Sequence, residues 1–106
     1  MKVEPTILQI INAVNDFVGF KVDFTTRKRE HCEPKQIMQY LIREILMVDH
    51  RQIAKYFNCD RSNIYNGVKK VSTLIKDKDK QIQYRTLFDQ FDIDIMDYGF
   101  DIKQKS

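Results

Sequence analysis

The chain has 106 residues, of which 42% are hydrophobic and 31% charged, so it can bury the core of one compact domain and is too short for two. Three glycines and two prolines interrupt it rarely, which favours helices over a β fold with many turns. No apolar run approaches the roughly 20 residues of a membrane-spanning helix, so we expect a soluble protein without a membrane segment.

The formal net charge of +3 is unevenly distributed along the sequence. Residues 21 to 80 carry 14 basic and 8 acidic side chains, whereas residues 81 to 106 carry 3 basic and 5 acidic side chains. A basic middle segment suits a polyanionic partner, although scattered lysines also occur on solvated helix faces.

Two cysteines, Cys32 and Cys59, follow no secretory hydrophobic segment, so we expect free thiols and a cytoplasmic protein rather than a disulfide scaffold. His31 and His50 lie near them in the sequence and are expected to be surface groups. Since no spacing matches the C-x2-C or H-x3-H ligand pairs of zinc sites, we expect neither a metal ion nor another cofactor.

Residues 5 to 20 predict a first helix, because Pro5 suits a first turn and apolar residues recur every three or four positions as far as Gly19. The stretch that follows, residues 21 to 34, loses this period and predicts a loop. Basic runs in loops are usually only solvated, but a loop that precedes a helix pair can also reach the minor groove of a duplex. The basic run here is Arg27, Lys28 and Arg29.

A second helix is predicted to open at residues 33 to 35, with Pro34 in its first turn, where the missing N–H costs nothing. The apolar stripe is nearly continuous over residues 37 to 47, so we expect this helix in the middle of the core. Asp49 is a suitable N-cap for a third helix of about two turns over residues 50 to 57.

Residues 58 to 60 form a polar interruption between apolar runs. Asn58 suits the left-handed C-terminal position of one helix, and Asp60 suits the N-cap of the next, which is predicted over residues 61 to 78. A short helix, a tight turn and a longer helix form the pattern of a helix-turn-helix. The small residues expected to let these two helices approach closely are Ala54 and Gly67.

In a helix-turn-helix the first turn of the second helix enters the major groove of DNA, where polar side chains meet base edges. In that turn Arg61 can contact guanine, and Asn63 can contact adenine. Asp60 or Ser62 can accept from cytosine or lie at a phosphate. The alternative is that Asp and Ser only cap a helix, as they do in any helical protein.

Residues 79 to 91 predict a last helix, with apolar contacts through Ile82, Leu87, Phe88 and Phe91. We place a domain boundary after residue 91, because residues 92 to 106 alternate acidic and apolar side chains. This tail either binds a protein partner or a second copy of the chain, or folds back on the core. The candidates for such packing are Ile93, Ile95, Met96 and Phe100.

The stretch RKREHCEPKQIMQYLIRE, followed by RQIAKYFNCDRSNIYNGVKKV, resembles the C-terminal DNA-binding domain (domain IV) of the bacterial replication initiator DnaA. The family pattern is a basic loop, a helix opening on Pro-Arg-Gln, a short helix ending in Phe, and a recognition helix that starts Asp-His-Thr-Thr and continues to Lys-Lys-Ile. The likeness covers residues 5 to 90. It implies an all-α, multi-helix domain of the Trp repressor and DnaA C-terminal type over residues 1 to 91.

By this resemblance the DNA-binding residues are assigned by position. Arg27 takes the place of the loop arginine that enters the minor groove, and Arg51 that of a proline beside a thymine methyl. The basic loop continues through Lys28 and Arg29. The first turn of the recognition helix, which reads the major groove of the DnaA box, comprises Asp60, Arg61, Ser62 and Asn63. Phosphate-contacting or basic positions are Lys35, Gln36, Arg43, Lys69 and Lys70.

Several positions depart from the family pattern. The turn at residues 58 to 60 is one residue shorter, and the family's histidine, second threonine and proline are replaced by Arg61, Asn63 and Arg51. Because replaced reading residues should alter the sequence read, we expect a site related to the DnaA box but not identical with it.

The glycines of this chain, at positions 19, 67 and 99, cannot build the G-x-x-x-x-G-K-[ST] loop of the initiator's ATPase domain. We therefore expect no ATP binding by that route. We interpret the chain as a stand-alone protein, of a kind that phages, mobile elements and some regulators use, rather than a fragment of an initiator.

The predicted function is sequence-specific binding of double-stranded DNA in the control of replication or transcription. The alternative is a protein-interaction domain that keeps the initiator-like fold and no longer reads DNA. Enzyme activity is not expected, because no paired-carboxylate, nucleophile-elbow or metal motif is present. Residues expected at the edge of the core, rather than stacked on bases, are Tyr40, Tyr56 and Tyr65.

Overall fold

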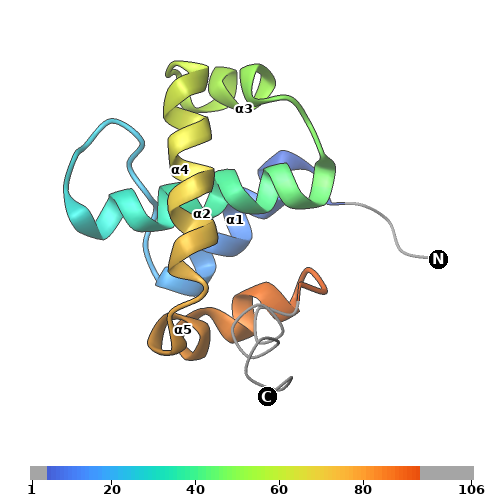
Figure 1. The fold of residues 1–106 in the computed structure, drawn as a ribbon. Helices are drawn as coiled ribbons and strands as arrows, with labels where there is room; N and C mark the ends of the chain where they lie inside the picture. Colours follow the sequence, from blue (N-terminus) through green and yellow to red (C-terminus); the bar gives the residue numbers. More distant parts are fainter. Residues whose placement is uncertain (1–4, 94–106) are drawn as a thin grey trace.

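The computed structural model describes residues 5 to 93, and every regular element in this part of the chain is a helix (Figure 1). The five helices are α1 (Ile7–Val18), α2 (Arg29–Leu46), α3 (His50–Phe57), α4 (Arg61–Leu74) and α5 (Lys78–Asp89). The predicted all-α class is therefore confirmed. Of the tail residues expected to pack on the core, Ile93 does so, while Ile95, Met96 and Phe100 lie outside the described residues.

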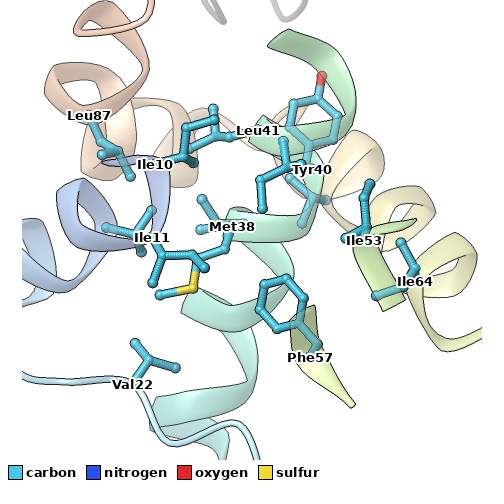
Figure 2. Packing of buried hydrophobic residues seen from close by; sticks show 14 of the residues in the cluster. Ile10, Ile11, Val22, Met38, Tyr40, Leu41, Ile53, Phe57, Ile64 and Leu87 are labelled. Carbon is cyan, nitrogen blue, oxygen red and sulfur yellow. The ribbon is translucent and has the colours of Figure 1, made fainter. Parts of the chain in front are cut away.

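The central helix is α2, which contacts α1, α3 and α4. Figure 2 shows side chains of α2 between those of α1 on one side and those of α3 and α4 on the other: Met38 and Leu41 lie between Ile10 and Ile11, and Ile53 and Ile64. All six are buried, and each such side chain contributes about 1.5 to 3 kcal/mol to folding by leaving water. The prediction of a central second helix is confirmed.

The limits of α2 differ from those predicted at both ends. It begins at Arg29, four residues before Glu33, so Pro34 lies in its second turn rather than its first. Pro34 gives up the bond that its N–H would donate to the Glu30 carbonyl, but Glu30 is exposed, and water can donate to that oxygen instead. At the other end Met47, expected in the apolar stripe, adopts a left-handed conformation (φ 56°) and is exposed.

The turn between α3 and α4 agrees closely with the sequence prediction. Asn58 ends α3 in a left-handed conformation (φ 52°), and Asp49 and Asp60 occupy the N-cap positions of α3 and α4. Neither aspartate side chain makes a capping hydrogen bond. The polar turn therefore depends on the backbone conformation of Asn58 rather than on carboxylate caps.

The predicted continuation of α4 to residue 78 is wrong, since α4 ends at Leu74. The N–H groups of Lys76 and Asp77 bond to carbonyls three residues earlier, which tightens the chain into a turn. The Asp77 carboxylate then accepts from the N–H of Asp79 and caps α5.

The buried face of α5 is also different from the one predicted. Ile82 is 64% exposed, whereas Gln81 and Tyr84 are buried together with Leu87 and Phe88. The Gln81 amide nitrogen donates to the Ile75 carbonyl (2.9 Å), so a polar residue takes a position that hydropathy alone assigns to its apolar neighbour.

A polar contact joins α5 to α2. The Tyr84 hydroxyl donates to the Glu33 carboxylate, and the Lys80 ammonium forms an ion pair with the same carboxylate at 3.0 Å. Burial, together with the hydrogen bond to Glu33, raises the pKa of the Tyr84 phenol. The phenol therefore stays protonated and keeps donating across the physiological range.

Gly67 marks the crossing of α4 over α2, not the contact between α3 and α4 that the sequence suggested. A Cβ atom at position 67 would lie 2.4 Å from Oε1 of Gln39 and 3.3 Å from Cγ of Gln36, both on α2. Ala54 is buried on α3, but the close approach made by Gly67 is to α2. Any side chain at position 67 would have to displace the Gln39 amide.

We predict that Gly67→Val lowers the free energy of unfolding by about 2 kcal/mol, because the added carbons collide with the buried Gln39 amide. Urea unfolding followed by circular dichroism measures the change. Thr73→Val, at an exposed position of the same helix, is the control and should shift the free energy by less than about 0.5 kcal/mol. Equal effects of the two variants would contradict the close crossing.

Candidate nucleic-acid interface

The first two turns of α4 present most of their side chains to solvent. Ile64 is buried against the core, whereas Arg61, Ser62 and Asn63 are exposed, as are Tyr65 and Asn66. The residues that the sequence assigns to base reading are therefore accessible. Asp60, at the N-cap, is exposed as well.

Contacts with the neighbouring helices hold the loop between α1 and α2 in place. The Val22 side chain is buried, and its N–H donates to Oδ1 of Asn15 at the end of α1 (2.9 Å). The Phe24 ring packs on the Phe57 ring of α3 with 4.5 Å between centroids. These contacts hold the loop, drawn in light blue in Figure 1, beside α4.

A hydrogen bond to His31 also attaches the loop to α2. The N–H of Asp23 donates to Nδ1 of His31 at 2.9 Å, so Nδ1 must carry its lone pair. The Phe20 ring lies edge-on to the same imidazole, at 5.0 Å. His31 is therefore half-buried and structural, which corrects the expectation of a plain surface group.

The loop and α4 enclose a pocket of about 420 Å³, here called the loop–α4 pocket. Its polar and charged lining residues are Thr25, Thr26, Arg27, Lys35, Gln36, Gln39, Asn58, Asn63, Asn66 and Lys70. Three cations and no carboxylate lie among its lining residues. The fold thus brings residues predicted for the minor groove (Arg27) and the major groove (Asn63) to one site.

Lys35 has a second role that the sequence did not indicate. Its Nζ donates to the Phe24 carbonyl (3.4 Å), so α2 holds the loop through a basic side chain. Cys59 lines the same pocket, and burial raises the pKa of its thiol despite the positive charge of Lys35. The raised pKa favours the protonated, less nucleophilic form of the thiol.

Other predicted residues line two further hollows. A second pocket of about 900 Å³, lower along α4, includes Arg29, Gln36, Lys69 and Lys70, together with Lys80, Glu33 and Asp77. A third hollow, of about 380 Å³ at the turn between α3 and α4, includes Arg51, Asp60 and Arg61.

Three predicted residues line none of these hollows, and one of them is Ser62, which is exposed in the first turn of α4. Lys28 is exposed at the N-cap of α2, next to the loop. Arg43 is half-buried in the last turn of α2, one helical turn beyond Gln39 on the same face, and lines none of the three hollows. Along α2, Arg43 therefore lies beyond the crossing, whose contacts with Gly67 are Gln36 and Gln39.

Some residues of this surface were missed or misjudged from sequence. Asn66 and the buried Gln39 line the loop–α4 pocket, and only their spacing from Asn63 and Gln36 could have pointed to them. Tyr56 and Tyr65, expected at the core edge, are more than half exposed, and the Tyr65 ring packs edge-on against His50 at 5.8 Å. Tyr40, also expected at the core edge, is buried in the core itself.

Within residues 5 to 93, no group of three or more His, Cys, Asp and Glu side chains is placed to hold a metal ion. In the same range, no helix has both the length and the apolar character needed to cross a membrane. Comparisons with models of protein families, with curated proteins and with solved structures find no match to this chain. The likeness to the DnaA domain therefore rests on sequence motifs alone.

The carboxylate of Asp23 offers a test of how the loop is ordered. It accepts from the hydroxyl of Thr25 (2.7 Å) and from its N–H (2.9 Å), and these bonds hold the pKa of Asp23 below its ordinary value. Because the folded pKa is the lower one, this contribution is present above the unfolded pKa and is lost as pH falls through the folded pKa.

We predict that Thr25→Val raises the pKa of Asp23 toward its ordinary value, since the strongest of these bonds is removed. An NMR titration of the Asp23 carboxyl carbon measures the midpoint. Thr26→Val, which removes a neighbouring hydroxyl that does not bond to Asp23, should leave the midpoint in place. An unmoved midpoint in Thr25→Val would refute the bond.

Proposed function

We propose that the chain binds double-stranded DNA in a sequence-specific manner, with α3 and α4 acting as a helix-turn-helix of the DnaA C-terminal type. In this proposal α4 enters the major groove, and the loop that carries Arg27 enters the neighbouring minor groove. The observation that supports it most is that Arg27 and Asn63, on separate elements, line one pocket.

The strand that separates two neighbouring grooves then passes between the loop and α4, with its phosphates at the cations of the loop–α4 pocket and its base edges toward α4. Each strand carries one negative phosphate per nucleotide, about 3.4 Å apart along the axis. Lys35 and Lys70 line this pocket, and its lining residues include no acidic side chain that would repel a phosphate. The positive charge of the pocket is therefore complementary to the negative charge of the strand.

The exposed residues of α4 divide into two roles by their position. Arg61, Ser62 and Asn63 lie in the first turn, where side chains meet base edges, and Arg61 is suited to the O6 and N7 atoms of guanine. Lys69 and Lys70 lie two turns later beside Arg29 and Gln36, and contact phosphates that fix the register without reading sequence.

Three further basic residues enlarge the proposed contact area on the duplex. Arg51 lies in the hollow at the turn between α3 and α4, with Asp60 and Arg61, and contacts the same major groove as the first turn of α4. Arg43, beyond the crossing of α2 and α4, and Lys28, at the start of α2, contact phosphates on either side of the pocket.

The biological setting that follows from the proposed likeness is the control of replication or transcription in the cytoplasm, at a site related to the DnaA box. The alternative, a domain that binds protein and has lost DNA reading, predicts no salt-sensitive affinity for any duplex. A salt series therefore separates the two functions.

We predict that affinity for duplex DNA falls steeply with salt. For about five phosphates neutralised, the slope of log affinity against log salt is about −4.5, which weakens binding several hundred-fold between roughly 50 and 200 mM salt. Fluorescence anisotropy with a random-sequence duplex measures this slope. A slope near zero, or no binding at the lowest salt, would exclude the proposed function.

We further predict that Arg61→Ala reduces the preference for the selected site over random duplex by roughly tenfold, because one bidentate base contact is lost. Lys69→Ala should weaken all duplexes alike and reduce the salt slope by about 1. Both effects are measured by titration of the selected site and of a random duplex.

The charge-matched control is Arg85→Ala on α5, where the side chain pairs only loosely with Asp89 at 3.9 Å. The variant removes one positive charge, as Lys69→Ala does, but Arg85 lines neither of the pockets beside α4. It should change neither preference nor slope, and a loss equal to that of Lys69→Ala would show that net charge alone drives binding.

A further inference from the structure

Four carboxamide side chains gather around Gly67 in the loop–α4 pocket. Gln36 and Gln39 come from α2, while Asn63 and Asn66 come from α4. Among residues 5 to 93, none of these four amides makes a side-chain hydrogen bond. Their donors and acceptors are therefore available to a bound molecule.

The presence of Gln39 makes this cluster more than a solvated surface. Gln39 is 3% exposed, and its amide oxygen lies directly against the Gly67 backbone. Gln39 lines the loop–α4 pocket, so a polar group bound there can reach its amide.

The two asparagines of the cluster share one face of α4. Asn63 and Asn66 are three residues apart, which separates them by about 4.5 Å along the helix axis. Neighbouring base pairs of a duplex are separated by about 3.4 Å, so two such side chains can meet two neighbouring pairs. Both asparagines are exposed, and both line the pocket.

A carboxamide has one acceptor and one donor side by side. This is the complement of N6 and N7 of adenine, and asparagine or glutamine bidentate to adenine is a recurring major-groove contact. Guanine presents two acceptors at the same positions and suits arginine or lysine instead. The carboxamide groups of the two asparagines therefore select adenine.

We infer that Asn63 and Asn66 together read two neighbouring A·T pairs in the major groove, so that the target site contains an adenine step beneath the second turn of α4. This inference rests on the proposed function and deepens it, because it names Asn66 as a second reading residue and gives the base class that both residues select. Gln36 and Asn66 line both the loop–α4 pocket and the pocket lower along α4, on either side of the close approach at Gly67.

Selection of bound duplexes from a random pool tests the inference, with wild type, Asn63→Ala and Asn66→Ala. The wild-type motif should contain two neighbouring A·T positions, and each variant should lose the preference at one of them. Replacing the adenine opposite Asn66 by 7-deazaadenine, which lacks N7, should weaken wild type roughly 5- to 100-fold and leave Asn66→Ala unchanged.

The matched control is Asn12→Ala, an exposed asparagine on α1, which should return the wild-type motif. Alanine favours helix, so thermal unfolding should show Asn66→Ala as folded as wild type.

The outcomes separate the inference from the proposed function. Duplex binding with steep salt dependence, but without neighbouring A·T positions or with both positions intact in Asn66→Ala, overturns only the inference. Absence of salt-dependent binding overturns the proposed function itself.

Discussion

The close crossing of α4 over α2 at Gly67 brings together the polar side chains of these two helices in the loop–α4 pocket. With no Cβ at this point, the backbone of α4 comes within contact distance of Gln36 and Gln39. The same crossing turns Asn63, Asn66 and Lys70 toward the loop and leaves Ile64 and Val71 facing the core. A wider crossing would open the pocket and expose α2 to water.

Much of this architecture follows from local sequence signals. The apolar stripe of α2, the left-handed Asn58 and the bounds of α3 were all predictable, because each depends on residues within one or two turns of one another. The exposure of Arg61, Ser62 and Asn63 followed from the same periodicity, since these positions lie off the apolar stripe of α4.

The rest depends on contacts between distant residues, which one sequence does not reveal. Pro34 marked a helix start by local rules, yet the turn before it is helical. Gln81 is buried in place of Ile82 because it donates to the Ile75 carbonyl across a turn. The pocket itself combines a loop residue, Arg27, with residues of α2 and α4, and no periodicity predicts that meeting.

The packing of Phe24 on Phe57 has a consequence for the proposed docking on a duplex. It holds the loop against the end of α3, next to the turn that leads into α4, so under that docking the spacing between the loop and α4 is set before a duplex binds. Under the proposed docking, a duplex that does not match this spacing must bend or twist, at a cost set by its own stiffness. Under that proposal, base steps that no side chain touches, such as flexible pyrimidine–purine steps, would also influence which sites are bound.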